Sequence, residues 1–415
     1  MLSARSTAGV AIATIAVSAL RCGAQCAYDV ITIPNPCPNG GGGAVKDINE
    51  DDVVVGFYTS CSSAVWRPWK WSEATGMITL PLPQVPGVGN VVASRIAPDG
   101  TIVGTVELPP GDHKALAVWT VDGAVSVAWP GGIGIDTSQC VKRGDGTILG
   151  ELQGGSGGFN PFAWLDGATA PLPEQLTSAH GGIFDVAANG LATGRRFMQS
   201  YIIDSLPFIW DGADAVEVLP IPTPYQRAEG KRIDAFGRVA GTANTTSAPA
   251  PTAFYWDIGS YTFLGGLPGD AFSSCVDSNV LGQVVGQSKT TPGAGGTPFL
   301  WQHGSMVPIK SLGTFPFPDQ PIVVGAINDN GTIAVQGLGH AYLLRPSGAV
   351  PADVDLDCRV DAEDLKLLLA CWGPADASPV KRADVNGDGS VDAYDLAEVL
   401  GAWTPVETTD RGRRK

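Results

Sequence analysis

The chain has 415 residues, enough for two or three domains. Its 54 glycines and 32 prolines, beside a hydrophobic fraction of 44%, favour short strands joined by frequent turns. A formal net charge of −15 argues against nucleic-acid binding, which requires a basic surface.

Residues 1–24 have the pattern of a signal peptide. Arg5 supplies the positive end, residues 8–20 form an apolar run, and residues 22–24 offer small side chains for cleavage. The run is too short to span a bilayer comfortably, and no later stretch is apolar enough to do so. We therefore expect an exported protein, extracellular or at the cell surface. An uncleaved N-terminal anchor is the alternative interpretation.

Of the eight cysteines, seven follow this segment, and an exported protein can hold them in disulfides. Cys37 and Cys61 lie in neighbouring loops, and Cys358 and Cys371 flank one short segment, so these are the two predicted pairs. The odd count leaves at least one thiol unpaired. No pair has the C-x-x-C spacing of zinc or redox sites, so neither chemistry is expected.

The segment that follows repeats with one period. Tryptophans preceded by an apolar or aromatic residue two positions earlier recur every 45 to 48 residues, and glycines that end a Val-Gly-like strand recur every 44 to 48. The markers are Trp71, Trp119, Trp164, Trp210, Trp256 and Trp301, and Gly56, Gly104, Gly150, Gly194, Gly241 and Gly286. A further copy at residues 327–335 keeps the strand but has Val335 in place of the glycine.

A period of this length with several short strands in each copy is typical of propeller blades. The second copy predicts four strands, at residues 91–96, 101–106, 115–120 and 124–128. Asp-Gly pairs at residues 99–100 and 122–123 favour tight hairpin turns between them. Each copy is therefore predicted to form one four-stranded blade.

The two ends of the array indicate how it closes. The last copy reaches residues 341–344 without a fourth strand, and residues 28–34, before the first copy, resemble the fourth strand at residues 77–83. An N-terminal strand that completes the last blade would cover an otherwise unpaired edge. The sequence therefore predicts an all-β domain at residues 25–349, a seven-bladed β-propeller closed by its N-terminal strand. Six or eight blades stay open as alternatives.

The repeated tryptophans could be sugar-stacking platforms or core residues between blades. A buried indole removes about 150–250 Å² from water, worth about 4–6 kcal/mol. A stacking site needs one or two such residues, whereas a core needs one in every blade, so their recurrence favours the core. Trp66, Trp69 and Trp129 lie outside this register and are freer to contact a ligand.

The copy at residues 253–288 contains the segments AFYW, FLGGLPGD and GQVVG. In these segments it resembles the HAF repeat, a family of extracellular repeats, and the sequences that end at Trp164, Trp210 and Trp301 match the opening of that repeat. The resemblance covers about residues 28–344. It implies a secreted, propeller-like domain and brings no catalytic residues.

Residues 350–404 form a different module, which is duplicated at an offset of 31. The coincident pairs are Asp353/Asp384, Asp355/Asn386, Asp357/Asp388, Asp361/Asp392, Asp364/Asp395, Leu365/Leu396, Leu369/Leu400 and Trp372/Trp403. The second copy sets oxygen ligands at positions 1, 3, 5, 9 and 12 of a loop, with Gly389 at position 6 and the Ser390 carbonyl at position 7. This spacing suits calcium, a hard cation that takes six to eight oxygens.

The module therefore predicts two calcium sites. The ligands would be Asp384, Asn386, Asp388, Ser390, Asp392 and Asp395 in the second loop, and Asp353, Asp355, Asp357, Arg359, Asp361 and Asp364 in the first. In the first loop Cys358 replaces the glycine and is expected to strain the turn, so the second loop is the better match.

In this pattern the module resembles a type I dockerin, a pair of calcium-binding loop–helix units that docks onto cohesin domains. The resemblance implies a cohesin-like or other docking protein as partner. Loop positions 10 and 11, which help to read the cohesin in that family, are Ala362 and Glu363 in the first copy and Ala393 and Tyr394 in the second, so the identity of the partner is open. An acidic, solvated tail is the alternative interpretation.

Several other features are better explained without catalysis. Residues 154–158 match the G-x-S-x-G nucleophile motif, but they lie in a glycine-rich loop of an all-β array. Residues 143–145 read Arg-Gly-Asp, but residues 144–146 are predicted to form an inter-strand turn. The four histidines share no repeat position. Asp185, Asp234 and Asp277 precede three of the glycine-ending strands, where capping is favoured over catalysis. The basic residues 405–415 are expected to be a solvated tail.

These observations favour a secreted, non-enzymatic binding or scaffold protein. The propeller would recognise a polysaccharide or a surface partner, and the calcium-dependent module would tether the chain. The alternative is a carbohydrate-active enzyme, a polysaccharide lyase or hydrolase with its site at the mouth of the channel. Two or three carboxylates with an Arg or His at that mouth would favour the enzyme.

Overall fold

The computed structural model describes residues 26–35, 37, 42–109, 113–128, 140–153, 159–177, 180–198, 204–213, 215–245, 250–291 and 293–404. The expected signal peptide, Trp129, the 154–158 motif and the basic tail lie outside these residues.

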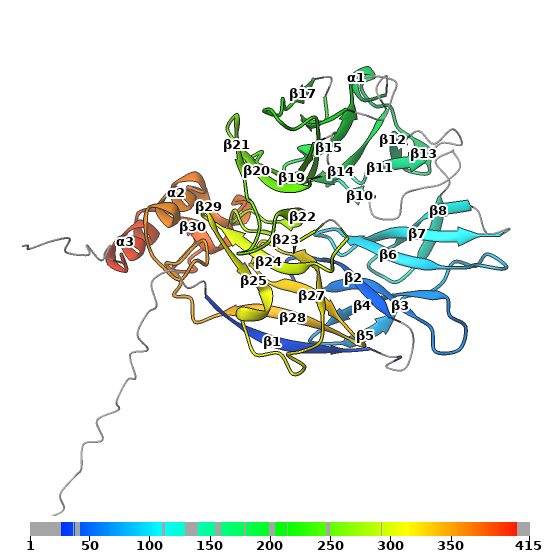
Figure 1. Cartoon of the computed structure of the whole chain (residues 1–415), viewed down its shortest axis with the longest axis horizontal. Helices are drawn as coiled ribbons and strands as arrows, with labels where there is room; N and C mark the ends of the chain where they lie inside the picture. Colours follow the sequence, from blue (N-terminus) through cyan, green and yellow to red (C-terminus); the bar gives the residue numbers. More distant parts are fainter. Residues whose placement is uncertain are drawn as a thin grey trace, which may run out of the picture.

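Within the described residues, strands β1 to β28 form seven groups of four hydrogen-bonded strands around a common centre (Figure 1). The first three groups are β2 (Gly43–Ile48), β3 (Val54–Thr59), β4 (Trp66–Ser72) and β5 (Gly76–Thr79); β6 (Val91–Ile96), β7 (Ile102–Leu108), β8 (His113–Trp119) and β9 (Val125–Ala128); and β10 (Val141–Lys142), β11 (Ile148–Gln153), β12 (Phe159–Leu165) and β13 (Ala168–Thr169).

The next three groups are β14 (Gly181–Val186), β15 (Ala192–Phe197), β16 (Ser205–Trp210) and β17 (Val216–Val218); β18 (Arg227–Ile233), β19 (Val239–Asn244), β20 (Thr252–Asp257) and β21 (Ser260–Phe263); and β22 (Phe272–Ser278), β23 (Val284–Lys289), β24 (Thr297–Gln302) and β25 (Ser305–Pro308). One parallel bridge, from Ser205 to Arg227, joins the first two of these groups into one sheet. The number of separate blades therefore stays a prediction.

The last group contains both ends of the all-β domain. It consists of β26 (Ile322–Ile327), β27 (Ile333–Gly337), β28 (His340–Ser347) and the N-terminal strand β1 (Ala27–Pro34). Strand β1 pairs antiparallel with β28 along its whole length, from Ala27 opposite Ser347 to Pro34 opposite His340. Completion of the last group by the N-terminal strand, as expected from the sequence, is confirmed.

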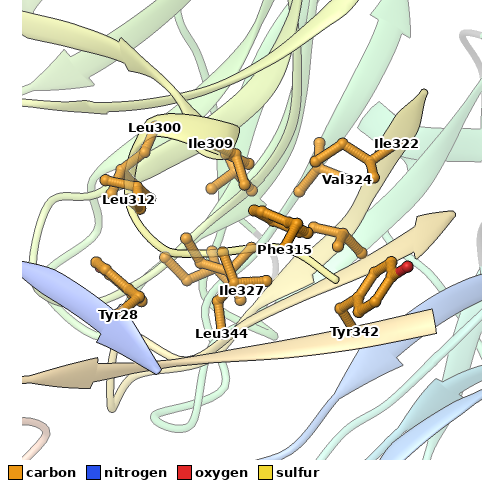
Figure 2. Packing of buried hydrophobic residues seen from close by; sticks show 13 residues of the cluster. Tyr28, Leu300, Ile309, Leu312, Phe315, Ile322, Val324, Ile327, Tyr342 and Leu344 are labelled. Carbon is orange, nitrogen blue, oxygen red and sulfur yellow. The ribbon is translucent and has the colours of Figure 1, made fainter. Parts of the chain in front are cut away.

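Buried side chains reinforce this closure. Tyr28 of β1 belongs to the same core cluster as Leu344 of β28 and Leu300 of the preceding group (Figure 2). Phe315 lies in the same cluster and packs edge-on against the ring of Tyr342, with ring centroids 5.4 Å apart. The ends of the domain are thus held by apolar packing as well as by backbone hydrogen bonds.

The remaining elements are few. The all-β domain also holds the short helices α1 (Glu174–Thr177) and η1 (Ile309–Ser311). The C-terminal module consists of α2 (Ala362–Ala370), β29 (Gly373–Pro374), η2 (Ala375–Ala377), η3 (Lys381–Ala383), β30 (Ser390–Val391) and α3 (Ala393–Gly401). The predicted class, an all-β domain with a small helical module, is confirmed. Among the described residues, no helix has the length and apolar character needed to cross a membrane.

Five of the six repeat glycines, all except Gly150, lie opposite a bulge in the first strand of their group. In the second group, the bulge falls between Ala93 and Arg95, and Gly104 pairs with Ala93. A Cβ atom on Gly104 would lie 1.9 Å from the carbonyl oxygen of Val92. A Cβ atom on Gly194 would lie equally close to the carbonyl oxygen of Gly182. At these two glycines the backbones approach so closely that a side chain does not fit. Val335 lies opposite the bulge of the last group, so a bulge alone does not require glycine.

We expect Gly104→Ala to lower the free energy of unfolding by about 1–3 kcal/mol, the usual cost of forcing extra atoms into a packed site. Urea denaturation of the full chain measures it. The control is Gly144→Ala, because a Cβ atom on Gly144 would have no neighbour within 4 Å. Equal effects of the two substitutions would show that the close approach at the bulge is not what requires glycine.

The repeat tryptophans are core residues, as the sequence indicates. Trp71, Trp119, Trp210, Trp256 and Trp301 are buried, and Trp164 is half-buried. The expectation for Trp69 is wrong, because its side chain is only 2% exposed and packs with Ile33 and Val45. Trp66 is 40% exposed. Trp66 and Trp69 differ because β4 turns alternate side chains to opposite faces, a detail that the repeat register alone does not contain.

Candidate functional site

The two loops of the C-terminal module have the same local structure. In the first loop, the Asp364 carboxylate accepts hydrogen bonds from the backbone N–H groups of Val354 (2.7 Å), Asp355 (3.2 Å) and Asp361 (2.8 Å). In the second loop, the Asp395 carboxylate accepts the three corresponding bonds at 2.8, 3.1 and 2.8 Å. The residue at position 12 therefore closes each loop onto the start of its helix.

The residue at position 1 organises the middle of each loop. The Asp384 carboxylate accepts from the backbone N–H groups of Asp388 (3.1 Å) and Gly389 (3.0 Å). Asp353 does the same for Asp357 and Cys358 at 3.1 and 3.0 Å. The hydrogen bonds of the two loops, like their residues, therefore repeat at an offset of 31.

The residues at position 9 begin the two helices. Asp361 accepts from the backbone N–H of Glu363 at 3.0 Å and caps α2, and Asp392 accepts from Tyr394 at 2.8 Å and caps α3. Each is part of a capping box that includes the carboxylate at position 12. Residues needed for a metal loop therefore also start its helix.

The buried carboxylates of the first loop fit a cation. Oxygen atoms of Asp353, Asp355 and Asp364 lie within 4.8 Å of one another, and all three residues are at most 1% exposed. Burial, followed by the neighbouring Asp355 carboxylate, raises the pKa of Asp353 to about 8 and that of Asp364 to about 7. Close carboxylates in a dry site repel one another, and an oxygen-only donor set of this kind suits calcium.

The second loop is more open to solvent. Asn386, Asp388 and Gly389 are exposed, Asp384 and Ser390 are half-buried, and Asp395 is buried. Gly389 has a φ of 94°, in the left-handed region that glycine adopts without strain. The glycine expected at position 6 from the sequence therefore has the conformation that the turn requires.

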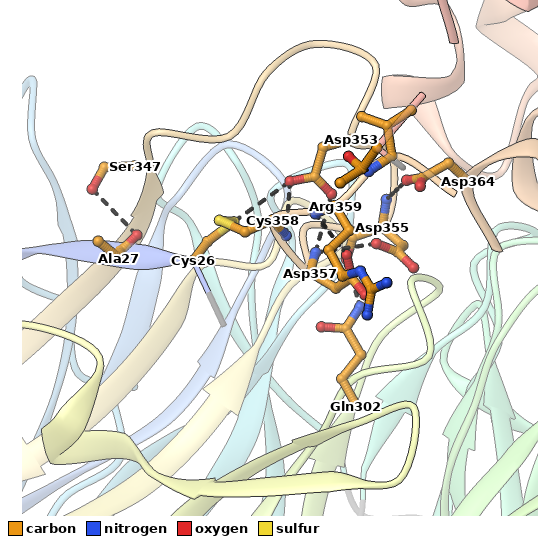
Figure 3. Close-up of a disulfide and its surroundings, with 12 residues drawn as sticks. Cys26, Ala27, Gln302, Ser347, Asp353, Asp355, Asp357, Cys358, Arg359 and Asp364 are labelled. Atoms are coloured by element: carbon orange, nitrogen blue, oxygen red, sulfur yellow. Dashed lines mark hydrogen bonds between the residues drawn. A yellow bond between two sulfur atoms is a disulfide. The ribbon is translucent and has the colours of Figure 1, made fainter. Parts of the chain in front are cut away.

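At the same position of the first loop, Cys358 has a φ of 66°, a conformation that L side chains rarely adopt. This agrees with the strain expected there. Cys358 is bonded to Cys26, with the two Cα atoms 5.1 Å apart (Figure 3). The predicted pair of Cys358 with Cys371 is therefore wrong, and Cys371 is buried in the core of the module. Pairing of β1 with β28 brings Cys26 to the start of the module, which no local spacing reveals.

The other predicted disulfide, between Cys37 and Cys61, is confirmed, with Cα atoms 5.5 Å apart. The predicted turn at residues 144–146 is also confirmed, because the Gly146 N–H donates to the carbonyl of Arg143 and the Thr147 N–H donates to the Asp145 carboxylate.

The first loop is packed onto the all-β domain by polar contacts. The Gln302 side-chain amide donates to the Asp355 carbonyl at 2.6 Å, and Nε2 of His303 lies 2.7 Å from the Asp355 carboxylate. Ring nitrogen and carboxylate oxygens of His303, Asp355 and Asp357 lie within 4.8 Å of one another. The sequence missed His303, because its role depends on a turn of the propeller meeting a loop more than 50 residues later.

Apolar side chains complete this junction. Val280 and Leu281, from the turn between β22 and β23, belong to the same buried cluster as Val354, Leu356 and Leu367 of the module. The core of the module is therefore continuous with the propeller. The first loop contacts the propeller at the junction, while α3 lies on the side of the module away from the propeller (Figure 1).

A second group of charged residues lies where the first strands of neighbouring groups contact one another. We call Asp47, Arg95, Asp185, Arg232 and Asp277 the axial network. The Arg95 guanidinium lies 3.5 Å from Asp47 and 3.6 Å from Asp185, and Arg232 pairs with Asp277. Each member stands nine residues before a repeat glycine. The repeat therefore places three carboxylates and two guanidinium groups together.

The carboxylates of the axial network also accept backbone hydrogen bonds from another group of strands. Asp47 accepts from the Ile96 N–H at 2.9 Å, and Asp185 and Asp277 accept in the same way from Ile233 and Ile327 at 3.0 and 2.9 Å. Asp234 does not belong here; it caps a turn by accepting from Phe236 and Arg238. Satisfied, buried ion pairs of this kind tie the groups together.

Residues 351–401 match the type I dockerin domain family. Domains of this family bind calcium, and a dockerin domain implies a cohesin partner. The chain has no match among curated proteins.

Solved structures similar to the chain include three proteins with low sequence identity. Virginiamycin B lyase from Staphylococcus aureus is 12% identical with a TM-score of 0.45, and the match covers 77% of this chain and 99% of that chain. The β-propeller domain of the Trilobed protease from Pyrococcus furiosus is 12% identical with a TM-score of 0.44, and the match covers 63% of this chain and 81% of that chain. Prolyl oligopeptidase B from Galerina marginata is 13% identical with a TM-score of 0.46, and the match covers 75% of this chain and 49% of that chain. Structural similarity at these TM-scores, all below 0.5, says nothing about the activity of this chain.

Proposed function

We propose that this chain is a secreted, non-enzymatic binding or scaffold protein, tethered by its dockerin domain to a cohesin-type partner. The observation that supports this most directly is the pair of loops with matching hydrogen bonds, in which Asp364 and Asp395 hold the loop backbones in the same way. Such loops are built to bind calcium and to present their helices in a fixed orientation.

Calcium in these loops would supply the positive charge that offsets the clustered carboxylates. The proposed ligands are the side chains of Asp353, Asp355, Asp357, Asp361 and Asp364 with the carbonyl of Arg359, and the side chains of Asp384, Asn386, Asp388, Asp392 and Asp395 with the carbonyl of Ser390. The protein residues hold the ligand oxygens in place by backbone hydrogen bonds, and two of the ligands also cap the helices.

The proposed docking face is the second loop–helix unit. Tyr394, at loop position 11, is 73% exposed, whereas its counterpart Glu363 lies beside the junction and is half-buried. Leu400 and Trp403, at the end of α3, are 53% and 38% exposed. Exposed apolar and aromatic side chains beside a polar rim are typical of protein interfaces. The matching residues of the first unit, Leu369 and Trp372, are 52% and 51% exposed. The two units therefore differ at loop position 11, where Tyr394 is free and Glu363 lies beside the junction.

The propeller would be the recognition domain, for a polysaccharide or another surface partner, and its resemblance to HAF repeats belongs to this proposal. The axial network supports binding over catalysis. It combines three carboxylates with two arginines, as the enzyme alternative requires, but the Asp47 and Asp277 residues are 8% and 3% exposed, and all three carboxylates are engaged with arginines and backbone N–H groups. A catalytic carboxylate must reach its substrate.

Binding of the full chain to immobilised type I cohesin domains, measured with calcium and with EDTA, tests the proposal. We expect calcium-dependent binding that Tyr394→Ala weakens about tenfold, a loss typical of an interface aromatic. Glu363→Ala, at the matched position of the first unit, should leave cohesin binding within about twofold of the wild type. Failure of every cohesin tested to bind the calcium-loaded chain would contradict the tether. Release of oligosaccharides from a polysaccharide by the purified chain would favour the enzyme.

A further inference from the structure

A cavity of about 310 Å³ lies at the junction between the propeller and α2. It is lined on the propeller side by Tyr255 and Trp301, whose ring centroids are 5.7 Å apart, and on the module side by Glu363 and Lys366 of α2. We call this cavity the junction pocket. Its volume is near the lower end for small-ligand sites, which are about 300–1,000 Å³ and occur preferentially between domains.

The pocket contains a buried polar group without a partner. The Tyr255 hydroxyl is almost completely buried and makes no hydrogen bond with any described residue. Burial raises its pKa, so the hydroxyl keeps its proton and can donate. An unsatisfied buried hydroxyl costs about 1–3 kcal/mol, a cost that a ligand with its own hydroxyl groups would remove.

Further hydrogen-bonding groups surround that hydroxyl. Asp257 and Thr262, on the neighbouring strands β20 and β21, also line the pocket, and their side chains make no hydrogen bond with the described residues. The indole N–H of Trp301 likewise makes none within the part of the chain described. On the propeller side the pocket therefore offers the Asp257 carboxylate, two hydroxyls and an indole donor beside two aromatic rings, and α2 adds the Glu363 carboxylate.

The charges in the pocket select among ligand classes. Asp257 and Glu363 disfavour a phosphate or another strongly anionic group. The positive charge of Arg238, whose guanidinium lies 5.9 Å from the Tyr255 ring, and that of Lys366 disfavour an organic cation. A purely apolar ligand would leave the Tyr255 hydroxyl unpaired. A neutral ligand rich in hydroxyl groups meets all of these conditions.

We propose that the junction pocket binds a neutral sugar unit, with a C–H face of the ring against Tyr255 or Trp301 and its hydroxyls paired with Tyr255, Asp257 and Thr262. This proposal rests on the proposed role of the propeller as a recognition domain and names the class of ligand. It does not depend on the cohesin partner.

The position of the pocket links sugar binding to the junction. One wall belongs to α2, which the Cys26–Cys358 disulfide and the contact of His303 with Asp355 hold against the propeller. His303 and Leu281 line the pocket and also take part in the junction. A bound sugar would therefore stabilise the docked arrangement of the two domains.

The experiment is isothermal titration of the full chain with cellobiose, xylobiose, maltose and lactose at millimolar concentrations, without any cohesin. We expect at least one of these sugars to bind. Tyr255→Phe keeps the ring and removes only the hydroxyl, so we expect it to weaken binding about fivefold to tenfold. The same variant should be at least as stable as the wild type, because it removes an unpaired buried group. Asp257→Ala should weaken binding to a similar extent.

Tyr261→Phe is the matched control. The Tyr261 hydroxyl donates to the Leu219 carbonyl at 3.2 Å, and Tyr261 is not part of the pocket wall. The Tyr261→Phe variant should leave sugar binding unchanged and lower the free energy of unfolding slightly. The proposal is wrong if none of the four sugars binds, or if Tyr255→Phe and Asp257→Ala bind as tightly as Tyr261→Phe. Cohesin binding by Tyr255→Phe, measured in parallel, should equal that of the wild type, so failure of the sugar site and failure of the tether are told apart.

Discussion

Replacing Cys26 and Cys358 together by serine should lower the free energy of unfolding of the full chain by about 5–6 kcal/mol. The bond joins residues 332 positions apart. A cross-link of this span removes a large part of the conformational freedom of the unfolded chain, and the effect grows slowly with the length of the closed loop. Urea denaturation, extrapolated to zero urea, measures the change.

The matched control is the double replacement of Cys37 and Cys61, whose bond spans 24 residues. The same relation gives it about 3 kcal/mol, so the longer bond should contribute more by about 2 kcal/mol. The longer bond also fastens β1 to the first loop, so its removal should speed hydrogen exchange in residues 353–358. A smaller loss for the long bond than for the short one would contradict this account.

The second large effect is expected at Asp395. Its carboxylate accepts three backbone hydrogen bonds, closes the second loop and is fully buried. Asp395→Ala leaves those three N–H groups unpaired and removes a proposed calcium ligand. We expect it to destabilise the module by about 3–5 kcal/mol, the range for breaking a buried charged network. Hydrogen exchange of residues 393–401 in the full chain, with calcium and with EDTA, measures this locally.

In the wild type, calcium at about 100 times its dissociation constant should protect α3 by about 2.7 kcal/mol relative to EDTA. Asp395→Ala should lose most of this difference. Asp376→Ala removes the same charge from an exposed position of η2 outside both loops. This variant should keep the full difference in α3 protection between calcium and EDTA. Protection of α3 that is the same with calcium and with EDTA in the wild type would contradict a metal-dependent second loop.

Local features of the fold were predictable from the sequence because they recur. Glycine repeats because a bulged strand brings two backbones within contact distance, as at Gly104, and tryptophan repeats because each group needs a large apolar side chain, as at Trp119. The calcium loops were predictable for the same reason. Their spacing sets which carboxylates can reach which N–H groups, as the three bonds to Asp364 and to Asp395 demonstrate.

Features that join distant parts of the chain were not predictable in the same way. Asp185 and Asp277 could be assigned to similar strand positions, but their arginine partners come from other groups of strands. The assignment of Cys358 to Cys371 followed sequence proximity, whereas the actual partner reaches it through the closing strand. His303 does not recur in the repeat, because its partner Asp355 belongs to the module and not to its own group of strands.

The sequence by itself therefore determined the repeating strands, the closing N-terminal strand and the two loop–helix units, because each depends on short-range spacing and on turn chemistry. Only the tertiary structure decided how the module meets the propeller. It placed Cys26, His303 and Leu281 around the first loop, and it formed the pocket beside Tyr255. The physical reason is that the surfaces of the two domains are complementary through residues 52 to 332 positions apart, and these residues come together only once the ring has closed.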